Sequence, residues 1–248
     1  MSGMPDSPWF VEAFRADYLD VYKHRSDEAA VREVRGALSL LRHDRERGRL
    51  LDLAAGSGRH SMAFAAERCH VTCLDLSDDL TVACAARGLR TVRADMRAIP
   101  FRDWSFDSVA CMFSSFGYFQ DEAEHQQTLC EIARVLTPGG AVLLDLMDPE
   151  TIHLHLVPQS VEMVGEAIIE VERCMTDDGR RVEKSIRFVR NDCNARTWRE
   201  SVRLFTGSEL KSLATRAQLE IETQVGDYEG HPHRSGETRR LVVMRKPR

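Results

Sequence analysis

The sequence has no long hydrophobic run. None of its apolar segments approaches the roughly 20 residues that a helix needs to cross a bilayer, although 43% of the 248 residues are hydrophobic. The first ten residues, MSGMPDSPWF, contain neither the basic start nor the apolar core of a secretory signal. We therefore expect a chain that is neither exported nor embedded in a membrane and that works in the cytoplasm.

Paired cysteines are also lacking. The seven cysteines are an odd number, no CxxC pair occurs, and several lie in apolar runs, where a reduced thiol behaves as a small hydrophobic side chain. Cys69 and Cys73 lie along the expected strand at residues 70–75, Cys69 directly before it and Cys73 on it, and no later Cys or His pair has the spacing of a zinc site. The sequence therefore predicts a reducing compartment and no metal site.

An excess of positive charge is absent as well. The formal net charge is −5 and the isoelectric point is near 6.0, which excludes a basic surface over the whole molecule and disfavours nucleic acid as a partner. The length and the balance of hydrophobic and charged residues fit one α/β domain over residues 1–248. No repeat, low-complexity stretch or linker divides the chain.

Short apolar runs alternate with amphipathic segments between residues 49 and 147. Such alternation is typical of a mostly parallel sheet with helices on both faces. Asp121 with Glu124 resembles a capping box at the start of one helix, and the TPGG segment from Thr137 is expected to end that helix. The expected strands are 49–54, 70–75, 89–94, 107–113 and 141–147, and the expected helices are 58–67, 78–87 and 122–136.

The segments on either side have different patterns. Residues 1–44 are helical in pattern, with Ser26 as an expected N-cap, and we interpret them as a cap on the fold that follows. Residues 151–205 contain longer β-like segments, which we interpret as an antiparallel insertion on the sheet's face or edge that forms part of the acceptor site. A further helix precedes two final strands, 219–227 and 239–245. The predicted class is therefore α/β, with a Rossmann-like, doubly wound sheet of seven mainly parallel strands, N-terminal helices and the antiparallel insertion.

A Gly-x-Gly corner follows the first expected strand, in LLDLAAGSGRHSMAFAAE, residues 50–67. Ligands of a doubly wound sheet bind at the carboxyl ends of its strands. Gly56 and Gly58 would let a ligand approach the main chain and would permit positive φ. The corner alone leaves open whether it holds phosphates, another adenosine-containing ligand, or nothing.

Acidic residues at two further strand ends favour an adenosine. Asp75 ends the second expected strand, 17 residues after Gly58, where a carboxylate can accept both ribose hydroxyls. Asp95 ends the third, where it can accept an adenine amino hydrogen while Met96 covers the ring. A dinucleotide would need a third glycine, where this sequence has Ser61. A smaller ligand, whose amino-acid end meets the corner, is therefore favoured.

The chain resembles the class I S-adenosylmethionine (SAM) dependent methyltransferases over about residues 45–150. The resemblance lies in five segments in family order: LLDLAAGSGRH, CLDLSDDL, RADMRAIPF, FDSVACMFSSFGYF and EIARVLTPGGAVLLDL. It implies SAM as the cofactor, with Asp52 ordering the corner and reaching the SAM ammonium, Asp75 binding the ribose and Asp95 holding the adenine. The same segments imply further cofactor contacts from Ala54, Gly56, Ser57, Gly58, Arg59, Leu76, Ala94, Met96, Met112 and Phe113.

The loop after the fourth expected strand, MFSSFGYF, should form the acceptor side. Its aromatic residues would make a wall there, although core packing explains each Phe equally well. In similar small-molecule methyltransferases the position of Tyr118 often carries a polar residue facing the acceptor, so Tyr118 is the first catalytic candidate. Tyr22, also a catalytic candidate, would cover the sulfonium and Arg25 would pair with the SAM carboxylate, unless they simply lie on an exposed helical face. His60 is a third catalytic candidate, for which a structural role has the greater weight.

These features predict a methyltransferase that acts on nitrogen or oxygen of a small molecule. The family's signature for methylating base amines of nucleic acids, Asn or Asp followed by Pro-Pro and an aromatic residue, is absent after the fourth expected strand. The C-terminal GDYEGHPHRSGETRRLVVMRKP also looks like that of a bacterial subgroup acting mostly on small molecules. The alternatives are an RNA or protein methyltransferase, a SAM-binding module without transferase activity, and a nicotinamide oxidoreductase. The oligomeric state stays open, with a homodimer among the options.

Overall fold

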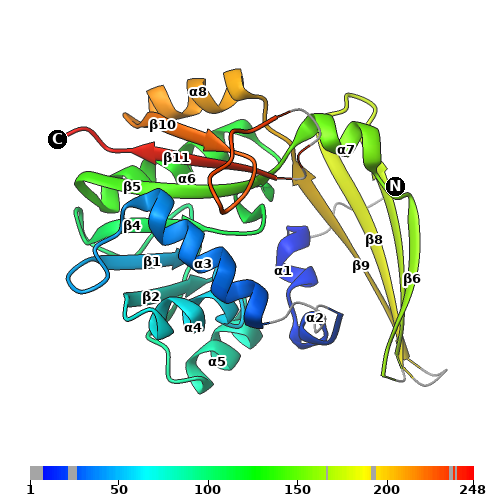
Figure 1. The fold of residues 1–248 in the computed structure, drawn as a ribbon. Coiled ribbons are helices and arrows are strands. Elements are labelled where there is room, and N and C mark those ends of the chain that lie inside the picture. The colour runs from blue at the N-terminus through cyan, green and yellow to red at the C-terminus, as the bar shows by residue number, and fades with distance from the viewer. Residues whose placement is uncertain (1–7, 22–26, 166, 191–193, 235–236, 238) are drawn as a thin grey trace.

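The fold is built around a mixed sheet of seven strands (Figure 1). The computed structural model describes residues 8–21, 27–165, 167–190, 194–234, 237 and 239–248. The strands of this sheet are β1 (Arg49–Leu53), β2 (His70–Asp75), β3 (Thr91–Arg93), β4 (Phe106–Cys111), β5 (Leu136–Met147), β10 (Glu220–Val225) and β11 (Arg239–Arg245). Their order is β10-β11-β5-β4-β1-β2-β3, in which every neighbouring pair from β5 to β3 is parallel and β11 runs antiparallel to β5 and β10. The predicted sheet of seven mainly parallel strands is confirmed.

Helices cover both faces of this sheet. They are α3 (Asp27–Leu41), α4 (Arg59–Ala66), α5 (Asp78–Ala86), α6 (Glu122–Val135) and α8 (Gly207–Arg216). Leu50 of β1 packs in the apolar cluster that contains residues of α3 and α4, whereas Leu51 and Leu53 pack in the cluster that contains residues of α6 and α8. Because successive strand residues point to opposite faces, the adjacent leucines Leu50 and Leu51 of β1 are explained by burial on both sides. Among the described helices, none is long and apolar enough to span a membrane.

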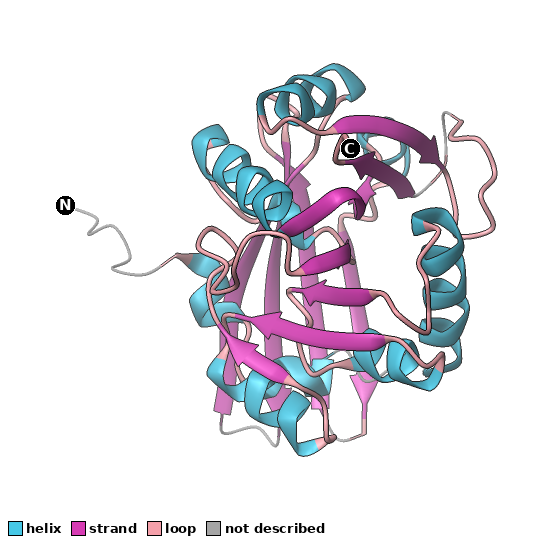
Figure 2. Ribbon diagram, turned by 90° about the vertical axis from the view of Figure 1, so that its left-hand side faces the viewer, coloured by secondary structure: helices cyan, strands magenta, loops and turns pink. Residues whose placement is uncertain are grey.

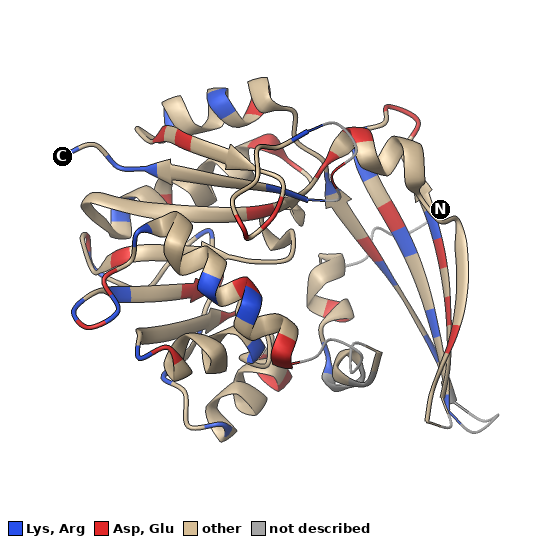
Figure 3. Ribbon diagram, viewed as in Figure 1, with Lys and Arg blue, Asp and Glu red and all other residues tan. Residues whose placement is uncertain are grey.

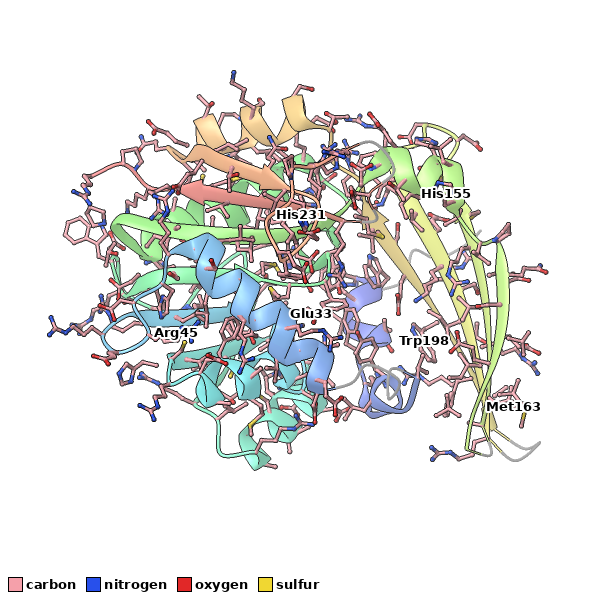
Figure 4. The ribbon with its side chains drawn as sticks, viewed as in Figure 1. Glu33, Arg45, His155, Met163, Trp198 and His231 are labelled. Atoms are coloured by element: carbon pink, nitrogen blue, oxygen red, sulfur yellow. The ribbon has the colours of Figure 1, made fainter. Side chains whose placement is uncertain are left out.

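A second, antiparallel sheet lies beside the first, and its strands run across the direction of the first sheet's strands (Figures 1 and 2). It consists of β6 (Gln159–Val164), β7 (Ala167–Met175), β8 (Arg181–Arg190) and β9 (Asn194–Arg203), in that order. One face of it forms an apolar cluster with the N-terminal helices α1 (Trp9–Ala13) and α2 (Ala16–Val21). Ile186, Phe188 and Trp198 are buried there in one cluster with Ala13 and Val21. Trp198 is labelled in Figure 4.

The antiparallel strands of residues 151–205 are thus present, but two details differ from expectation. The strands form a sheet of their own rather than an extension of the seven-stranded one. Thr151 also lies in a helix, α7 (Pro149–His155), instead of in the insertion's β segments. The Asp148 side chain caps this helix by accepting from the Thr151 amide at 3.1 Å, and Pro149 occupies its first turn. The Asp-Pro sequence favours a helix start here, because aspartate suits the N-cap and proline suits the first helical position.

The residues predicted to start and end helices can be compared with the structure wherever they are described. Asp121 with Glu124 forms the expected capping box of α6, and Thr206 with Glu209 forms a second capping box at the start of α8. The TPGG segment follows the end of α6 as predicted, but it already belongs to β5, which begins at Leu136 rather than at 141. The expected N-cap Ser26 lies outside the described residues.

Gly36 lets the loop between β10 and β11 pack against α3. A Cβ at Gly36 would lie 2.1 Å from the Tyr228 carbonyl oxygen, a contact with main-chain atoms that side-chain rotation cannot relieve. In an ordinary helix, replacing glycine by alanine gains about 1 kcal/mol of stability. We expect the Gly36→Ala substitution instead to lower the free energy of unfolding by roughly 1–3 kcal/mol, as overpacking does.

Denaturant unfolding measures this difference, with Ser39→Ala, an exposed position of the same helix, as the control. The control should be neutral or slightly stabilising. An increase in stability for Gly36→Ala would contradict the close packing of the loop on α3.

Candidate active site

A cavity of about 660 Å³ lies at the carboxyl ends of the parallel strands. Its size is within the range of small-molecule sites. It brings together most of the predicted site residues: Asp52, Ala54, Gly56, Ser57, Arg59, His60, Asp75, Leu76, Ala94, Asp95, Met96, Met112, Phe113 and Tyr118. Gly58 lies behind the lining as the N-cap of α4. Tyr22 and Arg25 lie outside the described residues.

The Gly-x-Gly corner has the open main chain that a cofactor needs. Gly56 and Gly58 both have positive φ, +57° and +82°, which L-residues adopt at a cost. A Cβ at Gly56 would meet no atom within 4 Å, so the corner is open at that point. A Cβ at Gly58 would instead lie 2.6 Å from Leu89 and 2.8 Å from the Cys84 sulfur. One glycine therefore exposes the backbone, and the other permits close packing beneath it.

Asp75 joins this corner to the end of β2. Its carboxylate accepts from the Gly56 amide at 2.8 Å and from the Ser77 amide at 2.9 Å. Burial raises its pKa, although these amide hydrogen bonds favour the charged form. Because a carboxylate offers about four lone-pair sites, Asp75 can accept further hydrogen bonds from hydroxyl groups in the cavity.

Asp52 lies deeper, near the end of β1. It is buried, and the Ser61 hydroxyl donates to it at 2.5 Å. Burial raises the pKa of Asp52 to about 7, against the opposing effect of the Ser61 hydrogen bond. Ser61 is the residue that stands in place of the third glycine of the dinucleotide pattern. A cation that reaches Asp52 would therefore meet a carboxyl group that ionises near neutral pH.

Asp95 has a partner that the sequence analysis missed. Arg97 donates to both carboxylate oxygens of Asp95, the shortest contact being 2.6 Å, and it also pairs with Glu124 of α6. Burial acts to raise the pKa of Asp95, but the hydrogen bonds from Arg97 outweigh it and lower that pKa. Asp95 is therefore held ionised and in one orientation at the cavity wall.

The loop after β4 is held in an unusual conformation. Phe113 and Ser114 both have positive φ, +56° and +63°, which costs non-glycine residues on the order of 1–3 kcal/mol each. The buried Asp145 near the end of β5 binds both amides: its carboxylate accepts from Phe113 at 2.9 Å and its carbonyl from Ser114 at 2.8 Å. The sequence analysis missed Asp145, for which the only available signal was a lone acid in the apolar run VLLDLM.

His60 lies in the cavity wall within a network of charged side chains. Its Nε2 atom is 2.8 Å from a carboxylate oxygen of Glu33 on α3, which also pairs with Arg59 at 3.2 Å (Figure 4). Burial lowers the pKa of His60, so its ring is neutral at pH 7. The contact with Glu33 accounts for His60 structurally, and its catalytic role stays a prediction.

Aromatic residues form the other end of the cavity. Phe10 of α1, Phe14 at the C-terminal end of α1, and Tyr18 of α2 line it with Tyr118 and Phe119. The Tyr118 ring stacks on Phe14 with centroids 5.2 Å apart, and its hydroxyl accepts from Ser115 at 3.3 Å. The predicted aromatic wall is therefore present at the cavity, but with more rings from the N-terminal helices than the sequence indicated.

One residue of the expected wall, Phe116 of the MFSSFGYF loop, lies elsewhere in the structure. Phe116 does not line the cavity; it is fully buried in the core, with its ring 5.4 Å from that of Phe205. No described residue of 151–205 lines the cavity either, because α1 and α2 lie between the second sheet and the cavity. The contribution of residues 151–205 to the acceptor site therefore stays a prediction.

The sequence and the structure both resemble known methyltransferases. Residues 50–140 match a family described as "Methyltransferase domain". The chain is 28% identical to the cypemycin N-terminal methyltransferase of Streptomyces sp., over 79% of this chain and 82% of that protein. It is 29% identical to the dTDP-3-amino-3,6-dideoxy-alpha-D-glucopyranose N,N-dimethyltransferase of Streptomyces fradiae, over 89% of this chain and 88% of that protein.

Solved structures share the fold over almost the whole chain. The CcbJ methyltransferase of Streptomyces caelestis matches with a TM-score of 0.81 and 13% identity, over 96% of this chain and 98% of that one. The sequence likeness thus covers the corner and the acidic strand ends, and the structural likeness covers both sheets. On this evidence residues 50–140 are a methyltransferase domain, and the comparisons support a class I S-adenosylmethionine-dependent methyltransferase with S-adenosylmethionine as its cofactor.

Proposed function

We propose that the protein transfers the methyl group of SAM to an amino group of a small molecule. The observation that carries this proposal is that one cavity joins the glycine corner and the acidic strand ends to an aromatic wall, so donor and acceptor can meet without crossing solvent. The two relatives are named for methylating a peptide N-terminus and an amino sugar, and in both the acceptor is nitrogen. Transfer to oxygen is the second candidate.

The chemistry of the lining suits an amine. Asp27 and Glu28, at the start of α3, add negative charge to a cavity whose other walls include several aromatic rings. Aromatic faces and carboxylates both attract cations, and amines are largely protonated when they arrive from neutral water. On the second sheet, by contrast, basic and acidic residues are interspersed along β7, β8 and β9, as in the pairs Arg187–Glu170 and Lys184–Glu200 (Figure 3). That pattern favours a small acceptor over an RNA.

We assign the cofactor contacts as follows. Asp75 binds the ribose hydroxyls, Asp95 and Met96 hold the adenine, and Asp52 receives the ammonium of the methionine part. Gly56 keeps the corner open for that part, and Gly58 permits the close packing beneath it. Ala54, Ser57, Arg59, Leu76, Ala94, Met112 and Phe113 complete the surroundings, with Tyr22 and Arg25 as further candidates.

The chain's own contribution to the reaction is alignment. SAM supplies a methyl group bonded to a cationic sulfur. When that bond breaks, the sulfur departs as a neutral thioether, which is a good leaving group. Holding the acceptor nitrogen in line with that methyl can lower the barrier by on the order of 7–11 kcal/mol. The aromatic wall excludes water, and we assign the Tyr118 hydroxyl to orient the amine and take part in the loss of its proton.

A labelling experiment tests the proposal. Purified protein is incubated with methyl-labelled SAM and a panel of low-mass amines, an amino sugar among them, and separately with a cell extract that is fractionated by mass. We expect label in amines and in the low-mass fraction. We expect Asp75→Asn to raise the dissociation constant of S-adenosylhomocysteine roughly 10- to 100-fold, because it loses a charge-assisted hydrogen bond.

The control is Asp79→Asn, an exposed acid in the first turn of α5, which should bind like the unaltered protein. Label confined to RNA or protein would contradict a small-molecule acceptor. Equal S-adenosylhomocysteine affinity in the two variants would show that Asp75 does not bind the ribose.

Ligand binding should also release a proton. With a pKa of about 7, Asp52 is protonated in roughly nine-tenths of molecules at pH 6, and the ligand ammonium favours its ionised form. Calorimetry with S-adenosylhomocysteine in buffers of different ionisation enthalpy should therefore show release of close to one proton at pH 6 and much less at pH 8. The affinity should rise over the same interval. Asp52→Asn should abolish this release; its persistence in that variant would assign the proton to another group.

The Tyr118 hydroxyl can be tested without disturbing its ring. We expect Tyr118→Phe to lower kcat about 10²-fold, the smaller end of the effect of a proton-transfer group, while the stacking on Phe14 and the KM for SAM are preserved. Tyr18→Phe, which removes another hydroxyl from the same wall, should change kcat less than threefold. A Tyr118→Phe variant with unaltered kcat would leave Tyr118 as a purely apolar part of the wall.

A further inference from the structure

Asp145 is a buried acid that does not itself line the cavity but binds a loop that does. Only 1% of its side chain is exposed. One carboxylate oxygen, Oδ2, accepts from the Phe113 amide at 2.9 Å, the Tyr228 hydroxyl at 2.8 Å and the Arg239 guanidinium at 2.5 Å. Three donors from three segments of the chain thus converge on one atom.

Two of these donors come from the C-terminal segment that the cofactor contacts leave unexplained. Tyr228 lies in the loop between β10 and β11, which packs next to α3 where Gly36 makes room for it (Figure 1). Arg239 begins β11. Burial and the neighbouring Asp145 carboxylate raise the pKa of Tyr228, so it remains a hydroxyl that can donate.

These contacts act on the part of the β4 loop that lines the cavity. The amides of Phe113 and Ser114, the two residues with positive φ, both donate to Asp145, so its side chain and carbonyl together hold the turn. The Arg239 guanidinium also lies 4.2 Å from the centre of the Phe113 ring. Ser115 and Tyr118, which follow directly, line the cavity.

We propose that Asp145, together with Tyr228 and Arg239, is a positioning residue for methyl transfer: it fixes the β4 loop so that Phe113 and Tyr118 face the acceptor correctly. The group acts through the loop and not on the cofactor's ribose or adenine, whose contacts lie at β2 and β3. This positioning role rests on the proposed function, because its effect is measured as a change in the rate of methyl transfer.

The chain contains a second buried Asp–Arg ion pair, which does not line the cavity. Asp148, three residues after Asp145, has a fully buried side chain and pairs with Arg240 at 2.9 Å. It also binds His233 at 2.9 Å and caps α7. None of these residues lines the cavity. Removing the charge of either acid should therefore cost stability, but only Asp145 should affect the loop.

The experiment compares Asp145→Asn, Tyr228→Phe and Asp148→Asn. Hydrogen exchange of the 112–119 segment, S-adenosylhomocysteine affinity, thermal unfolding, and kcat with the fastest amine of the panel are measured for each. We expect Asp145→Asn and Tyr228→Phe to speed exchange in this segment at least tenfold and to lower kcat at least tenfold, with a smaller change in the ligand affinity, to which this segment contributes only Met112 and Phe113. Asp148→Asn should lower Tm comparably to Asp145→Asn and leave both the segment's exchange and kcat within twofold.

Tyr228→Phe keeps the buried carboxylate and its arginine partner, so it remains informative if Asp145→Asn unfolds. Unaltered exchange at 112–119 in Tyr228→Phe, or faster exchange with unaltered kcat, overturns the proposal. An equal loss of kcat in Asp148→Asn also overturns it, because the effect would then be one of general stability. If the unaltered protein forms no S-adenosylhomocysteine with any amine, the proposed function has failed, and exchange still decides whether Asp145 holds the loop.

Discussion

Both faces of the parallel sheet are buried, and this constraint determines where the chemistry can lie. A polar side chain in the middle of β1, β4 or β5 would face packed leucines and valines, so polar groups gather where the strands end and the chain turns away from the helices. Asp75 is the last residue of β2, and Asp52 is the last but one of β1. The hydrogen bond from the Gly56 amide to Asp75 then joins the ends of these two neighbouring strands.

The charges around the cavity are arranged for a cationic cofactor. Asp95 is compensated by Arg97, Asp145 by Arg239, and Glu33 by Arg59. Each of these acids thus has a fixed partner and a fixed orientation. Asp52 has only the Ser61 hydroxyl as a side-chain hydrogen-bond partner among the described contacts, so its charge can respond to a ligand. Pairing with arginine thus limits the uncompensated negative charge around the cavity, which would oppose the dispersal of charge during methyl transfer.

Much of the fold and half of the site could be predicted from the sequence because their signals are local. The capping boxes at Asp121 and Thr206 depend on residues three apart, and the corner depends on a few consecutive residues. The contacts of Asp145 could not be predicted in this way, since Phe113, Tyr228 and Arg239 are far apart in the chain and meet only through the order of the strands. The separate second sheet was missed for a related reason: alternating polar and apolar residues predict strands, but they do not say which sheet a strand joins.

The N-terminal helices connect the second sheet to the cavity, and this arrangement explains how that sheet can matter without lining the site. Trp9 donates to the Tyr118 carbonyl at 3.1 Å, and the Ser77 hydroxyl donates to the Phe14 carbonyl at 2.5 Å, so α1 is attached to both halves of the cavity. On its other side the cap packs against Trp198 and Phe188 of the second sheet. A change in the shape of that sheet would therefore move Phe10 and Phe14, which line the acceptor end. The cofactor half, whose shape depends on the seven-stranded sheet, would stay as it is. Different elements shape the cofactor end and the acceptor end of the cavity. The acceptor end can therefore change while the binding of SAM is kept.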